Sequence, residues 1–225
     1  MKPLSRTEIA RYAASDIHDG WYVNLGIGLP TLVANVIAPE RCVFLHTENG
    51  ILNFGPAPTS EQADACLINA SKHPVSLRPG AAIFDSELSF SMMRGGHLDL
   101  AVLGAYEVAH NGDLANWTRN DPQVPPAVGG AMELAYGAKQ VWVLMEHTDK
   151  NGRPRVLHSC RLPLTAQQVV KRIYTNLAIL SISDHILQVD AMIEGMSLAE
   201  LQNLTEAQLR LDPACRVLKH AETRV

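Results

Sequence analysis

The sequence predicts an α/β protein with an open, mainly parallel sheet covered by helices. Short, continuous Val/Leu/Ile runs, such as residues 98–105 and 140–146, are typical of strands buried on both faces of a parallel sheet. Segments with helical spacing, closed by glycine, alternate with these runs. This alternation of strand and helix is the pattern of an α/β domain.

The chain opens with a predicted amphipathic helix. Ser5 and Glu8 form a capping box, and apolar residues follow at helical spacing until Gly20. Residues 21–25 are rich in strand formers. A glycine turn follows, and Pro30 is placed where the first turn of a second helix tolerates proline. These segments predict a helix, a strand, a glycine turn and a second helix.

The rest of the chain continues this alternation. Strands are predicted at residues 42–46, 98–105, 140–146 and 177–182, and helices at residues 84–96, 129–137 and 166–175, the last capped by Thr165. Residues 119–130 are rich in Pro and Gly and predict an irregular loop. From about residue 196 we expect short helix and loop at the periphery. We interpret residues 1–225 as one domain.

Composition excludes several classes of function. The chain is 47% hydrophobic and 19% charged, with a formal net charge of -4 and no dense Lys/Arg cluster, which argues against nucleic acid or an anionic membrane as partner. No apolar run reaches the eighteen or so residues of a membrane span, and the first twenty lack a signal-peptide core. Four cysteines without CxxC spacing fit a reducing cytoplasm. The nine histidines form no HExxH motif, so no metal is expected.

Three glycine-bearing loops are predicted to gather where ligands bind in open α/β sheets, outside the carboxyl ends of the strands. They comprise residues 24–30, 46–56 and 126–132. In the first loop, Gly26 and Gly28 let the backbone approach a ligand. The third glycine of a dinucleotide fingerprint is missing, and a tight strand-to-helix turn is the alternative interpretation.

Glu48 is the candidate catalytic residue of the second loop. It follows an apolar run and precedes Asn49 and Gly50, so a solvated turn is the ordinary alternative. A carboxylate acts as a nucleophile when water is excluded and positioned donors meet the developing oxyanion. Gly50 removes side-chain bulk beside the acid. Residues 129–130 open a helix and offer backbone N–H groups.

Other chemistries are less well supported by the sequence. His46 and His97 are possible bases, but single histidines near apolar runs are more often core or rim residues. No G-x-S-x-G elbow is present, which argues against a serine hydrolase. The functional interpretation therefore depends on Glu48 and the glycine loops together.

Six segments in order resemble the β subunit of the 3-oxoacid CoA-transferases. The resemblance covers about residues 4–182 and is carried by residues 23–35, 47–58, 79–105, 112–117, 126–134 and 145–157. It implies the fold of that subunit. It also identifies Glu48 with the glutamate of the (S/T)-E-N-G motif, the nucleophile of a ping-pong reaction through a glutamyl-CoA thioester. Coenzyme A is then a cosubstrate, and no permanently bound cofactor is implied.

The resemblance also assigns residues around this nucleophile. Gly129 and Gly130, with Asn49 and Gly50, are expected at the oxyanion and CoA pocket. The substrate pocket is expected to be lined by three residues of the first loop, namely Asn24, Gly26 and Gly28. The chain departs from the family at two positions where relatives usually have Gly, namely Asn53 and Ser71. Asn tolerates a left-handed backbone, whereas Ser tolerates it less readily.

The family further implies a partner and two substrates. An α subunit carries much of the CoA-binding surface, so we expect a heterodimer or an α2β2 heterotetramer. Residues 4–10, 44–50, 91–99 and 172–178 favour 3-oxoadipate as the acceptor of CoA from succinyl-CoA. Residues 79–86 and 163–167 resemble the acetoacetate-using branch. An acyl-CoA hydrolase and a non-catalytic ligand-binding module are the alternatives.

Overall fold

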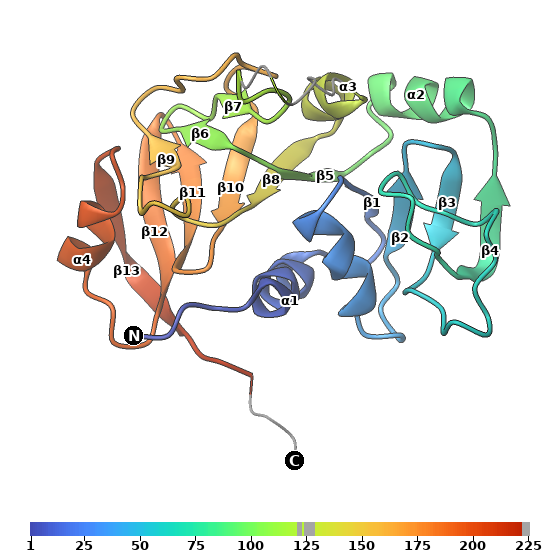
Figure 1. The fold of residues 1–225 in the computed structure, drawn as a ribbon, viewed down its shortest axis with the longest axis horizontal. Coiled ribbons are helices and arrows are strands. Elements are labelled where there is room, and N and C mark those ends of the chain that lie inside the picture. The colour runs from blue at the N-terminus through green and yellow to red at the C-terminus, as the bar shows by residue number, and fades with distance from the viewer. Residues whose placement is uncertain (121–122, 124–128, 222–225) are drawn as a thin grey trace.

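The computed structural model describes residues 1–120, 123 and 129–221 and contains one continuous ten-stranded sheet (Figure 1). Its strand order is β13-β12-β11-β10-β8-β5-β1-β2-β3-β4. The central strands run parallel to one another and comprise β2 (Phe44–Thr47), β1 (Tyr22–Leu25), β5 (Leu100–Gly104), β8 (Gln140–Leu144) and β10 (Val170–Tyr174). The α/β prediction is confirmed, and the parallel arrangement holds for this centre.

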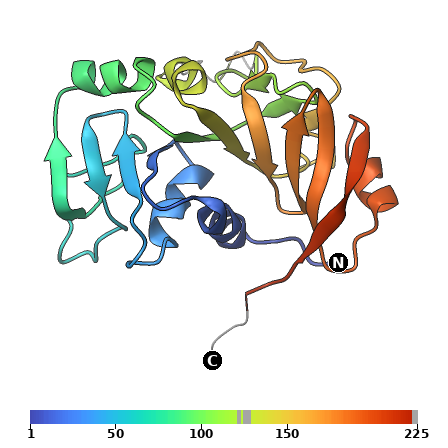
Figure 2. The same cartoon turned by 180° about the vertical axis from the view of Figure 1, so that it is seen from behind.

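Antiparallel strands extend the sheet on both sides of the centre. On one side lie β3 (Ile51–Phe54) and β4 (Leu77–Ile83), and on the other lie β11 (Ala178–Ser183) and β12 (Ile186–Ile193). The last strand, β13 (Leu209–Leu218), pairs parallel with β12. Figure 2 shows from behind that β13 and β4 lie at opposite ends of the sheet. A separate small sheet has the order β7 (Leu114–Ala115), β6 (Glu107–Ala109) and β9 (Val156–Leu157).

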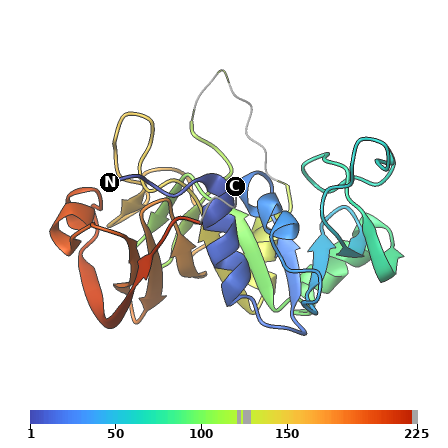
Figure 3. The same cartoon turned by 90° about the horizontal axis from the view of Figure 1, so that it is seen from below.

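Within the described residues, five helical segments accompany the sheet. They are α1 (Arg6–Asp16), the 3-10 helix η1 (Leu29–Asn35), α2 (Ser86–Arg94), α3 (Ala131–Gly137) and α4 (Leu198–Asn203). The predicted capping box of α1 and the predicted α2 and α3 are confirmed. Helix α1 packs on η1, β8 and β10, as the view from below shows (Figure 3). Helices α2 and α3 lie side by side at the carboxyl edge of the central strands (Figure 1).

Two helix predictions need correction. The segment 166–175 is not a helix, because residues 170–174 form β10 between β8 and β11. Buried β-branched and aromatic side chains such as Ile173 and Tyr174 suit a central strand, and tertiary packing overrides local helical spacing there. The helix after Gly28 is confirmed in place, but it is a 3-10 helix of seven residues instead of an α-helix.

The carboxyl-terminal prediction was also incomplete. Helix α4 was expected, but the ten-residue strand β13 was not, and it forms one edge of the main sheet. Most of the predicted irregular stretch 119–130 falls outside the described residues. Among the described residues, no helix combines the length and apolarity that a membrane crossing requires.

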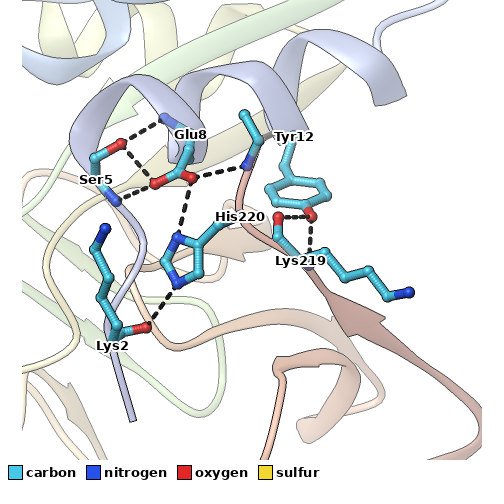
Figure 4. Close-up of polar contacts among 7 residues, drawn as sticks. Lys2, Ser5, Glu8, Tyr12, Lys219 and His220 are labelled. Carbon is cyan, nitrogen blue, oxygen red and sulfur yellow. Dashed lines mark hydrogen bonds and ion pairs between the residues drawn. The ribbon is translucent and has the colours of Figure 1, made fainter. Parts of the chain in front are cut away.

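The two ends of the described chain are held together beside α1 (Figure 4). Glu8 accepts hydrogen bonds from His220 Nδ1 and the Ala221 N–H, both at 3.0 Å. The Tyr12 hydroxyl donates to the Lys219 carbonyl at 2.7 Å. Burial alone would raise the pKa of Glu8, but the hydrogen bonds, including those of the capping serine, outweigh it and hold the pKa at about 2. The hydrogen bonds to ionised Glu8 therefore stabilise the fold above about pH 4.5, and this stabilisation is lost as the pH falls toward 2.

Candidate active site at the carboxyl edge of the sheet

A cavity of about 660 Å³ lies at the carboxyl edge of the central strands. Residues from all three predicted glycine loops line it, including Glu48, Asn24, Gly26, Gly28, Gly129 and Gly130. The convergence of these loops was predicted from the sequence. Another part of the lining comes from segments around the small sheet, and it includes Tyr106, Trp117, Arg119 and Arg155.

Glu48 lies in a tight turn between β2 and β3. Because Thr47 pairs with Ile51, Glu48, Asn49 and Gly50 form a three-residue hairpin loop. The turn interpretation of this triplet is thus correct, but it does not exclude a functional role, since the half-buried Glu48 also lines the cavity. Strand β2 is a central strand, so its turn lies at the edge where ligands bind in such sheets.

The Glu48 carboxylate contacts Gly130 of the third loop. The Gly130 N–H donates to Glu48 Oε2 at 3.2 Å. A Cβ atom at Gly130 would lie 2.6 Å from Oε2 and 3.1 Å from Phe90 Cζ, so only glycine allows this approach. Gly129, with a left-handed φ of 47°, lies beside Oε1, where an added Cβ would be 3.9 Å away.

Three influences act on the pKa of the Glu48 carboxyl group. Burial raises its pKa, the Gly130 N–H lowers it, and the negative charge of Glu133 raises it again. The net effect is a pKa above the ordinary value of a glutamate. The site therefore holds a carboxylate whose charged form is poorly solvated.

The first loop forms the floor of the cavity. At Gly26 an added Cβ would lie 3.1 Å from both the Val102 carbonyl oxygen and a Leu103 methyl carbon, so glycine permits the close approach of β1 and β5. Gly28 has a φ of 88° and opens η1. Its N–H donates to Ser71 Oγ at 3.4 Å, which brings one of the two unusual residues against this loop.

Asn49 and Gly50 do not line the cavity but shape the turn. The exposed Asn49 side chain donates to the Ile68 carbonyl at 2.8 Å and accepts from the Thr47 hydroxyl. Gly50 is buried with a φ of 101°, and an added Cβ would overlap the Phe84 carbonyl oxygen. Both residues hold the loop that presents Glu48.

A Gly50→Ala variant is expected to lose about 2 kcal/mol or more of unfolding free energy, because it combines left-handed strain with a backbone clash. Urea denaturation measures the loss. Gly20→Ala is the matched control: Gly20 has a φ of 84° but open space at its Cβ, so only the strain of about 1 kcal/mol remains. Equal losses in the two variants would contradict the role assigned to the clash.

The two residues that depart from the family pattern, Asn53 and Ser71, differ in backbone conformation. Asn53 adopts the expected left-handed conformation, with a φ of 61°, and its side chain donates to the Pro79 carbonyl at 3.0 Å. Near Ser71, the left-handed position is held by Lys72 instead, with a φ of 61°. Ser71 therefore needs no left-handed backbone, and its hydroxyl reaches Gly28.

The part of the cavity lining around the small sheet was not identified from the sequence. The Arg119 guanidinium lies over the Tyr106 ring at 4.5 Å, and both residues line the cavity with Arg155. These residues are far apart in the chain and carry no motif, and the small sheet brings them together. Among the described residues, no group of three or more His, Cys, Asp or Glu side chains is arranged to hold a metal ion.

Comparisons with known proteins agree with this geometry. Residues 6–203 match the coenzyme A transferase family model. The chain is 50% identical to the B subunit of the 3-oxoadipate CoA-transferase of Acinetobacter baylyi, over 92% of this chain and 95% of that protein. It is 46% identical to the B subunit of the succinyl-CoA:3-ketoacid coenzyme A transferase of Helicobacter pylori strain 26695, over 92% of this chain and 99% of that protein.

A solved structure supports the same fold. The apoenzyme of an acyl-CoA transferase from Escherichia coli O157:H7 superimposes with a TM-score of 0.74 at 18% identity, covering 96% of this chain and 43% of that longer chain. At this identity the likeness concerns the fold alone. With the family match over residues 6–203, the chain belongs to the coenzyme A transferase family.

Proposed function

We propose that this chain is the β subunit of a CoA-transferase that moves CoA from succinyl-CoA to a 3-oxo acid, with 3-oxoadipate favoured and acetoacetate as the alternative. The observation that carries the proposal is the half-buried Glu48 carboxylate, which faces the cavity and accepts a hydrogen bond from the Gly130 N–H. The relatives named above support the reaction class. The higher identity to the 3-oxoadipate enzyme favours that acceptor.

In the proposed first half-reaction, a Glu48 carboxylate oxygen attacks the thioester carbonyl carbon of succinyl-CoA. The carbon–sulfur bond breaks, the CoA thiolate leaves, and a succinyl-glutamyl anhydride remains. The thiolate then attacks the glutamyl carbonyl carbon and releases succinate, which leaves a glutamyl-CoA thioester on Glu48. The 3-oxo acid reverses these steps through its own carboxylate.

Two local features suit this chemistry. Partial burial of Glu48 limits the access of water, which would hydrolyse an anhydride. Attack on the glutamyl carbonyl places negative charge on an oxygen of that side chain, and the Gly130 N–H already points at Oε2. A donor of this kind contributes on the order of a hundredfold or more in rate.

The proposal includes a second, different subunit. The relatives at 50% and 46% identity are named as B subunits, which implies a companion chain in each enzyme. We therefore propose an α subunit as the partner of this chain, in a heterodimer or α2β2 heterotetramer. Residues 1–225 would form one domain of this assembly. The four cysteines are free, which fits a cytoplasmic location.

The covalent intermediate provides the direct test. The two-subunit complex is incubated with succinyl-CoA without acceptor and then treated with borohydride, which reduces a glutamyl thioester to the alcohol. Peptide mass spectrometry should find the change on the Glu48 peptide, together with loss of activity. Full transfer activity with an unmodified Glu48 would refute the proposal.

Two controls separate the alternative functions. An acyl-CoA hydrolase would release free acid from succinyl-CoA at the same rate without a carboxylate acceptor, whereas a transferase requires the acceptor. A non-catalytic module predicts that Glu48→Ala leaves the assembled complex fully active. Comparing kcat/KM for 3-oxoadipate and acetoacetate identifies the acceptor.

The raised pKa of Glu48 predicts an acid limb in the pH profile of the first half-reaction. The carboxylate is the nucleophile, so thioester formation falls as the pH drops through this pKa. In Glu133→Gln one of the causes of the shift is removed, and the limb is expected to move to lower pH. Stopped-flow measurement of glutamyl-CoA formation checks this, and a limb displaced to higher pH would contradict it.

A further inference from the structure

Three buried polar side chains, those of Asn24, His46 and Ser89, are joined by hydrogen bonds next to the cavity. The Asn24 amide nitrogen lies 2.9 Å from His46 Nδ1, and His46 Nε2 lies 3.1 Å from Ser89 Oγ. These three side chains come from β1, β2 and α2, and none is more than 1% exposed. Asn24 and His46 are also register partners on neighbouring strands. Asn24 lines the cavity, so these hydrogen bonds connect the cavity lining to the core.

The chemistry of these side chains determines which group donates and which accepts in each hydrogen bond. Burial lowers the pKa of His46 to about 4, so the ring is neutral near pH 7 and has one donor and one acceptor nitrogen. The amide nitrogen of Asn24 can only donate, so Nδ1 accepts and Nε2 carries the proton toward Ser89. The Ser89 hydroxyl then donates to the Thr47 carbonyl at 3.4 Å.

The same series of hydrogen bonds extends to the Glu48 hairpin. Thr47 immediately precedes Glu48, and the Thr47 side chain also holds Asn49 within the turn. Ser89 belongs to α2, which packs on α3, and Gly130 at the start of α3 contacts Glu48. The imidazole therefore lies between the cavity floor, the hairpin and the helix pair that together surround the carboxylate.

We propose that His46 is a positioning residue for CoA transfer, acting through Asn24 in the cavity lining and through Ser89 on the Glu48 hairpin. This inference depends on the function proposed above. Polar side chains without access to water destabilise a core unless every one is paired, and an apolar trio would pack there at less risk. Their connection to the cavity through Asn24 favours a role in the reaction over a purely structural one.

The test compares His46→Leu with His46→Gln in the two-subunit complex. The Leu variant removes both hydrogen bonds and is expected to lower kcat about tenfold to a hundredfold, the effect of misplacing a reacting group by a fraction of an ångström to one ångström. The KM for succinyl-CoA should change much less. A Gln side chain can accept from Asn24 and donate to Ser89, so the Gln variant should recover most of kcat.

His147 provides a matched control. It is 0% exposed, bonds to Thr175 and Thr205 hydroxyls at 3.0 and 2.9 Å, and does not line the cavity. His147→Leu should lower the melting temperature but leave kcat per borohydride-labelled site unchanged. Normalising kcat to labelled sites removes the contribution of unfolded protein. If His46→Leu folds too poorly, Ser89→Ala deletes one hydroxyl and is expected to lower kcat in the same direction.

Two results would overturn the inference. One is a wild-type kcat per labelled site in both the His46→Leu and Ser89→Ala variants. The other is an equal loss in His147→Leu, which would show that any buried histidine has the same effect. Failure of the proposed function is distinguishable, because the wild-type complex would then transfer CoA without labelling at Glu48, or would not transfer it at all.

Discussion

The Glu48→Gln variant of the assembled enzyme is expected to lose CoA transfer by about a thousandfold or more. The amide has nearly the same shape and can still accept the Gly130 hydrogen bond, but it cannot attack a thioester to form an anhydride. Steady-state assay of succinyl-CoA consumption with 3-oxoadipate or acetoacetate measures the loss. Borohydride should no longer label the peptide.

The same variant is expected to be at least as stable as the wild type near neutral pH. A carboxyl group with a raised pKa destabilises the folded protein above that pKa, because the charged form is poorly solvated. The neutral amide removes this penalty, so the melting temperature should hold or rise. Glu133→Gln is the neighbouring control and should keep most of the activity. Normal turnover in Glu48→Gln would remove the basis for the proposed reaction.

Gly130→Ala is the second variant with a large expected effect, about a hundredfold or more in kcat. Gly130 has a φ of -87° and a ψ of 12°, which alanine adopts without left-handed strain. The added methyl group, however, would lie 2.6 Å from Glu48 Oε2 and must displace the carboxylate. Loss of the N–H contact and of the carboxylate position then combine.

Gly129→Ala is a control for Gly130→Ala, because the added methyl group lies farther from the Glu48 carboxylate. Its Cβ would be 3.9 Å from Glu48 Oε1, an ordinary contact, although the left-handed φ of 47° costs about 1 kcal/mol. We therefore expect a smaller loss of kcat and a larger loss of stability than in Gly130→Ala. The opposite ranking, measured by kcat per labelled site and by thermal unfolding, would contradict the steric argument.

The parts of the fold with strong local signals were predictable from the sequence. Continuous apolar runs identified β5 and β8, the capping box identified α1, and helical spacing closed by glycines identified α2. The exposed strand β4, which contains Pro79 and Gly80, has no such pattern and was missed. Strand β12 does alternate buried and less buried residues, so a signal was available there. In β10 the local spacing was misleading, because pairing on both sides decides its conformation.

The site was predictable where its residues lie in short loops at strand ends. Glu48 and Gly26 follow this rule, whereas Gly130 was identified as the start of a helix, and all three line one cavity. Residues such as Tyr106 and Arg119 could not be assigned, since their contact depends on how the small sheet packs. The hydrogen bonds of His46 could not be predicted from the sequence either, because they depend on the register of β1 with β2 and on the position of α2.

The three-residue loop between β2 and β3 also limits how this enzyme can be redesigned. Side chains alternate between the two faces of a strand, so one inserted residue would shift the Thr47–Ile51 pairing and turn the following side chains, including the buried Phe54, to the wrong face. The length of this loop is therefore constrained. Libraries that aim at new acyl groups should keep it constant and vary the cavity lining at the half-buried Trp117 and the exposed Arg119.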